Sequence, residues 1–228
     1  MLVPAALAPV LLTALAAPPA AADESGPTVV AEEGGPTVAA ALLAKIRGCA
    51  QISKGRYRAD DGAPANIPVC GGKGVVHFKA DLDIDCDGRP SSVCNKRTDP
   101  YFQPTTAFQD ARGRHLDSAK LPYVVVPGAS KLWSHRDSKV WGGGLAAVVH
   151  RGKVQYAVVG DTGPADLIGE ASYATARGLG INPHPVRGGA ARDVTYIFFT
   201  GSEVKPIESA GAAQRMGAEL TRRFLAGQ

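Results

Sequence analysis

The chain has 228 residues, of which 45% are hydrophobic and 20% are charged, and its formal net charge is +4. This length and composition are typical of one globular domain with a sizeable core, and they exclude a fully disordered or low-complexity chain. The positive balance is weak and the basic residues are scattered along the chain, so we expect no nucleic-acid partner.

The N-terminal segment has the composition of a secretory signal peptide. Residues 2–22 carry no charged side chain, contain the apolar run from Val10 to Ala17, and end in three alanines. Prolines interrupt the segment and leave an apolar core too short to span a bilayer. We therefore expect residues 1–22 to be a signal peptide cleaved near Ala22, and the mature protein to be secreted and free of the membrane.

The next segment, residues 23–40, is rich in Gly, Pro, Glu and Thr and contains the near-repeat Gly26-Pro-Thr-Val29 and Gly35-Pro-Thr-Val38. This composition predicts a flexible linker or propeptide. From Ala39 to Arg47 the spacing of Ala, Leu and Ile is helical. Residues 41–228 are then expected to form a single domain.

Four cysteines, Cys49, Cys70, Cys86 and Cys94, allow three ways of forming two disulfides. We favour the pairs Cys49–Cys70 and Cys86–Cys94, because each closes a segment rich in turn residues and brackets no other cysteine. A zinc site is the alternative, but no Cys-x-x-Cys motif or neighbouring His supports it.

After Cys49 the pattern changes to short alternating segments separated by Gly and Pro, which predicts strands. Arg151-Gly152-Lys153 is expected to join two of these strands as a hairpin. Residues Ile207–Phe224 place apolar side chains at four-residue steps, which predicts an amphipathic C-terminal helix. The predicted fold is mostly β: a compact, double-psi-like β-barrel with short peripheral helices. The predicted strands are Val75–Asp85, Leu121–Val126, Leu145–His150, Val154–Val159 and Val194–Phe199.

The first long predicted strand carries a row of carboxylates. Its polar and apolar residues alternate, so the polar set is expected on a single exposed face. Like charges about 7 Å apart along a strand repel each other unless a cation, buried donors or solvent offsets the repulsion. Three interpretations stay open: a solvated acidic edge, a calcium loop from Asp83 to Gly88 that has Cys94 where an EF-hand requires Glu, or binding of the ammonium groups of a ligand. The carboxylates concerned are Asp81, Asp83, Asp85 and Asp87.

Two further carboxylates bracket a turn. The run Val154–Val159 predicts a strand, Gly and Pro break it, and a short helix is expected from Glu170 to the stop at Gly178. Asp161 then ends a strand and Glu170 begins a helix. Two carboxyl groups on rigid supports are what glycoside hydrolysis requires, one to protonate the leaving oxygen and one to activate water or attack carbon. The structural alternative is a turn-forming Asp and a first-turn Glu favoured by the helix dipole.

Four sequence blocks occur in one order: Asp81-Leu-Asp-Ile-Asp-Cys-Asp-Gly88, Pro100-Tyr-Phe-Gln-Pro-Thr105, Leu121-Pro-Tyr-Val-Val-Val-Pro127, and Gly160-Asp-Thr-Gly-Pro164 followed by Ile168-Gly-Glu-Ala-Ser172. Together they resemble the secreted chitosanases of glycoside hydrolase family 75, over roughly Cys49 to the C-terminus. The resemblance implies an inverting, endo-acting hydrolase of chitosan whose essential carboxylates match Asp161 and Glu170.

On this basis we expect Glu170 to be the general acid and Asp161 the general base. A helix N-terminus would favour charged Glu170, so acid duty requires burial to raise its pKa. Chitosan is the expected partner, bound by a monomer without a cofactor or metal. The expected substrate contacts are Asp81, Asp83, Asp85 and Asp87, which would meet the amines, and Tyr101, Gln103 and Thr105, which would line the cleft by their position in the family motif.

Other catalytic fingerprints are absent from the sequence. It contains no Gly-x-Ser-x-Gly elbow, P-loop or dinucleotide motif, and no His pair has metal-ligand spacing on a predicted helix. Two rival hypotheses remain. A non-catalytic expansin-like or carbohydrate-binding wall module would need one or neither of the two carboxylates, and a calcium-dependent structural module would centre on Asp81 to Asp87.

Overall fold

The computed structural model describes residues 1–2 and 35–228, and the described residues from 35 onward belong to one compact unit. The expected signal peptide, apart from its first two residues, and residues 23–34 of the expected linker lie outside the described residues. Within the described part, no helix has both the length and the apolar character needed to cross a membrane.

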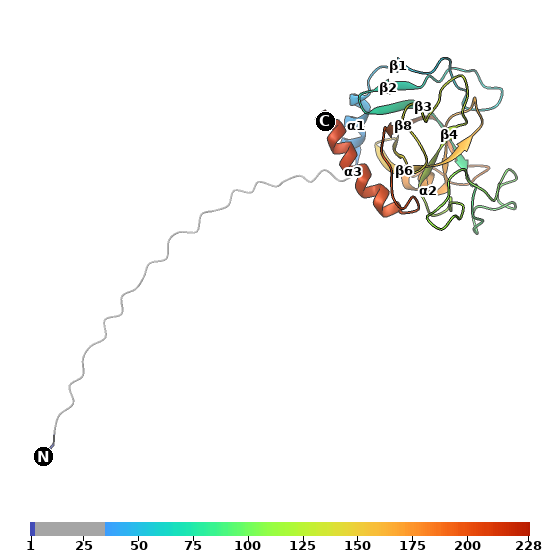
Figure 1. Ribbon diagram of the computed structural model, residues 1–228. Helices are drawn as coiled ribbons and strands as arrows, with labels where there is room; N and C mark the ends of the chain where they lie inside the picture. Colours follow the sequence, from blue (N-terminus) through green and yellow to red (C-terminus); the bar gives the residue numbers. More distant parts are fainter. Residues whose placement is uncertain (3–34) are drawn as a thin grey trace. The chain divides into compact units, whose positions relative to one another are not determined.

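Six strands close into a mixed β-barrel (Figure 1), so the predicted mostly β barrel is confirmed. The order around the barrel is β3, β7, β4, β6, β5 and β8, and β8 pairs with β3 to close it. The pairs β3–β7 and β4–β6 are parallel, and the others in the barrel are antiparallel. Short strands β1 and β2 extend from the first part of β3. The strands are β1 Ala50–Gln51, β2 Cys70–Gly72, β3 Val75–Asp85, β4 Tyr123–Pro127, β5 Leu145–His150, β6 Lys153–Gly163, β7 Glu170–Ser172 and β8 Ala190–Phe199.

The predicted hairpin joins β5 and β6, with His150 paired to Lys153. Its two loop residues, Arg151 and Gly152, have φ values of 44° and 78°. Positive φ at both positions is the pattern of a type I′ turn, whose twist matches that of the flanking strands.

Within residues 35–228, three helices cover the barrel: α1 Pro36–Lys45, α2 Tyr173–Leu179 and α3 Ala210–Ala226. The first begins earlier than predicted, at Pro36, which is tolerated in the first turn because its missing N–H has no helical partner there. The C-terminal helix begins later than predicted, because Ser209 caps it by accepting a hydrogen bond from the N–H of Ala212.

Two hydrophobic clusters lie on opposite faces of the barrel strands. One takes side chains from all six barrel strands and fills the interior, where Phe78 stacks on Tyr196 with ring centroids 4.7 Å apart. The other covers the outer face and includes Leu42 of α1 and Ala213 of α3. In Figure 1 the red helix α3 lies along the outside of the barrel with α1 beside it.

Both predicted disulfides are present. Cys49 pairs with Cys70 and Cys86 with Cys94, each with a Cα–Cα distance of 5.0 Å, and no described cysteine is free. The first links the residue before β1 to the first residue of β2, and the second closes the loop that follows β3. Two disulfides are consistent with folding in an oxidising compartment.

Candidate active site

A β-bulge in β6 directs Asp161 to the outer face of the barrel. Val124 pairs with Val159, but Val125 pairs with Asp161, so Gly160 is the extra residue. A Cβ at Gly160 would lie 2.6 Å from the Cβ of Tyr123, so only glycine fits. Because the bulge shifts the alternation by one residue, Asp161 shares the outward direction of Val125.

Glu170 is the first residue of strand β7, so the predicted helix start is wrong. Strand β7 lies between β3 and β4. Pairing with both strands gives its main chain hydrogen bonds that a helix at this position would not make. Ala171 points into the interior cluster, so Glu170 faces outward like Asp161. Helix α2 begins only at Tyr173, with Ser172 as its N-cap, and ends at the left-handed Gly180 instead of the predicted Gly178.

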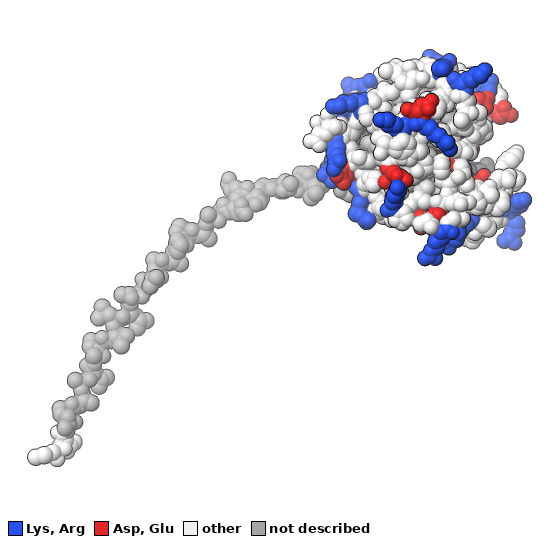
Figure 2. All heavy atoms as spheres, viewed as in Figure 1, with Lys and Arg blue, Asp and Glu red and all other residues white. Residues whose placement is uncertain are grey.

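The two carboxylates line one pocket of about 300 Å³. Five carboxylates face this pocket, and among the described residues that line it none is Lys or Arg. Figure 2 shows that Lys and Arg are spread over the visible face of the molecule, so the pocket concentrates negative charge on a protein with a positive net charge. The lining residues include Asp85, Asp87, Asp99, Tyr101, Asp161, Thr162 and Glu170.

Asp161 is held by main-chain donors. Its Oδ1 accepts hydrogen bonds from the N–H of Ala107 at 2.8 Å and from that of Thr162 at 2.7 Å. Burial raises the pKa of Asp161, while these two donors and the charge of His115 oppose the rise. No described residue donates to Oδ2, which leaves that oxygen available to a ligand or water.

Glu170 has no hydrogen-bond donor among the described residues. Burial, followed by the charges of Asp83, Asp161 and Asp87, raises its pKa to about 7. The burial that acid duty requires is therefore present, and the helix N-terminus that would have opposed it is not at this residue.

Asp85 and Asp87 flank Cys86, whose disulfide to Cys94 anchors them at the edge of the pocket. Asp85 Oδ1 accepts from the N–H of Asp87 at 2.6 Å, and Asp87 Oδ1 accepts from the N–H of Gln103 at 2.7 Å. Burial and the charge of Asp161 raise the pKa of Asp85 well above its usual value. The pKa of Asp87 rises to about 6, mainly through burial.

The predicted single exposed face of β3 is wrong. The register with β8 shifts between Ala80 and Leu82, and Asp81 within this irregularity is only 5% exposed, whereas Asp83 is exposed. These two carboxylates do not line the pocket but lie beside Asp60. Burial raises the pKa of Asp81 to about 7, and partial desolvation of the Asp83 carboxylate raises its pKa to about 6, with repulsion between neighbouring carboxylates adding to both.

The remaining predicted cleft residues differ in their positions. Tyr101 lines the pocket and is 85% exposed, whereas Phe102 is buried against the Cys86–Cys94 disulfide. Gln103 contributes its main-chain N–H to Asp87, as described above. Thr105 is exposed and is not among the residues that line the pocket.

Sequence reasoning missed three contributors. Asp99 lines the pocket and accepts a hydrogen bond from the N–H of Tyr101 at 2.9 Å. Asp99 directly precedes the block Pro100–Thr105, so its position in the sequence could have identified it as a residue of the site. Ala107 acts through its main chain, and Asp60 approaches β3 from a distant loop, so neither had a recognisable sequence signature.

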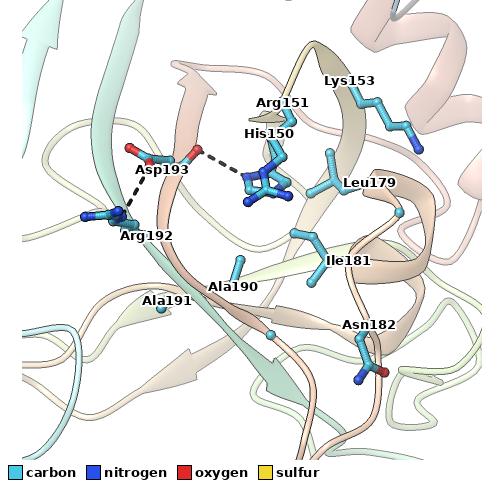
Figure 3. Close-up of a pocket in the computed structure, with 12 residues that line it drawn as sticks. His150, Arg151, Lys153, Leu179, Ile181, Asn182, Ala190, Ala191, Arg192 and Asp193 are labelled. Atoms are coloured by element: carbon cyan, nitrogen blue, oxygen red, sulfur yellow. Dashed lines mark hydrogen bonds and ion pairs between the residues drawn. The ribbon is translucent and has the colours of Figure 1, made fainter.

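A second, larger pocket of about 560 Å³ has a different character (Figure 3). It is lined by basic residues such as Arg151 and Lys153 and contains one carboxylate, Asp193. That carboxylate is in ion pairs with Lys79 at 2.6 Å and Arg192 at 3.6 Å. Among the described residues that line this pocket there is no second acidic side chain, so it lacks the pair of carboxyl groups needed for acid and base chemistry.

A pocket that holds two carboxylates on separate strands, one buried (Asp161) and one partly buried (Glu170), is the arrangement that glycoside hydrolases use. A family model described as fungal chitosanase of glycosyl hydrolase group 75 matches residues 82–224, and the chain belongs to this family. The resemblance seen in the sequence blocks is therefore confirmed.

Relatives of known name agree with this family. The chain is 34% identical over 137 residues to endo-chitosanase B of Aspergillus oryzae, a match that covers 57% of each chain. It is 30% identical over 172 residues to an endo-chitosanase of Aspergillus fumigatus, covering 71% of this chain and 68% of that one. It is 31% identical over 132 residues to endo-chitosanase C of Aspergillus oryzae, covering 55% of this chain and 32% of that one. The chain thus spans little more than half the length of the first of these relatives.

Proposed function

We propose that this chain is a secreted, endo-acting hydrolase that cleaves the β-1,4 linkages of chitosan with inversion at the anomeric carbon. One observation supports this most strongly: in a member of the chitosanase family, Asp161 and Glu170 face the same acidic pocket from two different strands. We propose residues 41–228 as the catalytic domain, acting as a monomer after removal of residues 1–22.

Glu170 is the proposed general acid. It is enclosed, lacks stabilising donors and is surrounded by negative charge, all of which favour its protonated form. In the bond-breaking step its proton passes to the glycosidic oxygen, and the bond between that oxygen and the anomeric carbon breaks.

Asp161 is the proposed general base. The N–H groups of Ala107 and Thr162 stabilise its carboxylate and fix its orientation through Oδ1. The free Oδ2 can accept a proton from a water molecule, whose oxygen then attacks the anomeric carbon from the side opposite the leaving group. Inversion in one displacement requires about 6.5 to 9.5 Å between the two carboxyl groups, so that this water fits.

The negative pocket suits a polymer of glucosamine. Each deacetylated sugar carries an ammonium group, whereas chitin and cellulose offer no such charge. Asp85 and Asp87 lie at the pocket and are the proposed amine contacts, with Asp99 as a third. The exposed ring of Tyr101 provides an amphipathic surface for a sugar face. Asp81 and Asp83 lie outside this pocket, and a direct amine contact through them would be revealed by stabilisation of the protein by glucosamine oligomers that is lost in Asp60→Asn.

The experiment is reducing-end release from chitosan, chitin and carboxymethylcellulose by the purified protein, together with co-sedimentation of the protein with insoluble chitosan and chitin. The proposal predicts release of reducing ends from chitosan, with little release from chitin, which is uncharged, or from carboxymethylcellulose, which is acidic. Binding to chitosan without any release would instead support the non-catalytic carbohydrate-binding module.

A further inference from the structure

We propose that Asp60, Asp81 and Asp83 form a binding site for a hard divalent cation, with Ca²⁺ as the best-suited ion. These residues are separate from the acid and base, and the inference does not depend on the proposed hydrolysis. The cluster joins a loop before β2 to the outer part of β3.

The spacing of the carboxylates fits an ion. One oxygen from each of the three residues lies within 4.8 Å of the other two. Ca²⁺ binds carboxylate oxygens at about 2.3 to 2.6 Å, so oxygens on its coordination sphere are separated by up to about 5 Å. An ion placed among the three oxygens can therefore contact all of them with small adjustments. A donor set made only of oxygen favours Ca²⁺ or Mg²⁺ over softer metals.

Asp81 is the independent sign of a missing ligand. The residue is 5% exposed, and its Oδ1 is buried without a hydrogen-bond partner among the described residues. A Cβ at Gly169 would lie 2.0 Å from this oxygen, and the φ of Gly169 is 124°, so the fold uses glycine to admit the carboxylate. A buried carboxylate without a partner is costly, and a cation shared with its neighbours would offset the cost.

The nearest basic side chains in sequence are engaged elsewhere. Lys79, on the same strand, pairs with Asp193 at 2.6 Å, and Arg58, in the same loop as Asp60, pairs with Asp166 at 2.6 Å. No ion pair within the described residues includes a member of the cluster. The protein therefore brings three carboxylates together, while the two nearest basic side chains in sequence pair with other carboxylates.

The approach of Asp60 is set by the main chain. The N–H of Arg58 donates to the carbonyl of Asp166 at 3.0 Å, and the N–H of Ile168 donates to the carbonyl of Arg58 at 3.0 Å. These bonds attach the loop to the segment leading into β7, beside β3. A cation would add a second connection between this loop and β3, so its binding should raise the thermal stability.

A polymer amine is a poorer fit for the same cluster. Oδ1 of Asp81 is buried, so an ammonium group on a bulky sugar cannot reach it from solvent, whereas a bare ion can lie between the ligands. The other carboxylate cluster, Asp85, Asp87 and Asp161, lacks this feature, because main-chain N–H groups donate to each of its members.

The test is calcium titration by calorimetry after dialysis against chelator, with the melting temperature measured in parallel. The wild type should bind one Ca²⁺ through this site. At a Ca²⁺ concentration of about 100 times Kd, its melting temperature should rise by about 5 °C or more. Asp60→Asn, at an exposed position, should weaken binding at least tenfold and lose most of that rise. The exposed Asp137→Asn is the matched control and should behave like the wild type.

Three results would overturn the proposal. One is no binding of Ca²⁺, Mg²⁺ or Mn²⁺ by the wild type together with an unchanged melting temperature. Another is equal affinity in wild type and Asp60→Asn, which would place the ion in the second cluster. The third is stabilisation of the wild type, but not Asp60→Asn, by glucosamine oligomers and not by Ca²⁺, which would identify an amine subsite. None of these readouts uses hydrolysis, so failure of the cation site is distinguishable from failure of the enzymatic proposal.

Discussion

Gly163 offers a sharp test of how closely the position of Glu170 controls the reaction. A Cβ at this residue would lie 2.7 Å from Oε2 of Glu170 and 3.2 Å from Cγ1 of Val125. The backbone of Gly163 has no positive φ, so alanine is sterically allowed there. In Gly163→Ala the carboxyl group must therefore move by about 0.5 Å to restore van der Waals contact.

The magnitude follows from the precision that acid catalysis requires. Active-site groups must lie within about 0.5 Å of the productive position, and an error of about 1 Å costs about 100-fold. We expect kcat on chitosan to fall roughly tenfold, equivalent to about 1.4 kcal/mol. The melting temperature should change little, because the displaced atoms are the end of a flexible side chain.

The assay is reducing-end release at saturating chitosan, combined with calorimetric melting. Gly211→Ala is the matched control, because its new Cβ would meet only Arg215 Nη1 at 3.5 Å, in helix α3 away from the pocket. This control should keep wild-type kcat and gain slightly in stability. Wild-type kcat in Gly163→Ala, or a loss explained entirely by unfolding, would refute the reasoning.

Further predictions concern the carboxylates themselves. Asp161→Asn and Glu170→Gln should each abolish chitosan hydrolysis with nearly unchanged melting temperatures, because the side chain keeps its shape and loses only its ionisation. The control variant Asp166→Asn should stay active. Near wild-type turnover in Asp161→Asn or in Glu170→Gln would remove that residue from the mechanism. Converting both Asp85 and Asp87 to Asn should raise KM more than it lowers kcat and flatten the salt dependence of KM, and an unchanged KM with a flat salt response in the wild type would oppose amine binding. In buffer with chelator, kcat should decline as the pH rises through about 7. The raised pKa of Glu170 means that the acid is protonated below that value and loses its proton above it. A kcat that does not change between pH 6 and pH 9 would contradict the acid role.

Local signals in the sequence were sufficient for much of the fold. The turn at Arg151 and Gly152, the two disulfides and the positions of β3, β5 and β6 depend on short stretches of chain whose chemistry favours one local structure. The family blocks also placed Asp161 and Glu170 close to one turn. These features need no knowledge of distant partners.

The geometry of the site depends on distant partners and could not be read from local patterns. Glu170 belongs to a strand because β3 and β4 lie on either side of it, which overrides the helical pattern that follows. Asp161 faces outward because of the bulge at Gly160, and Asp81, at the point where the register with β8 shifts, is buried against Gly169 of a distant segment. Asp60 lies beside Asp81 and Asp83 only in the folded protein, so no local pattern in the sequence predicts this contact.

The most direct test of the central claim is the configuration of the first product. Chitosan oligomers would be cleaved by the wild-type protein in an NMR tube, and the anomeric signals would be recorded before mutarotation. Single displacement by a water held by Asp161 predicts that the α-anomer appears first from the β-linked substrate. Initial accumulation of the β-anomer would instead indicate a covalent intermediate, with two carboxyl groups only about 5 to 5.5 Å apart, and would contradict the proposed mechanism.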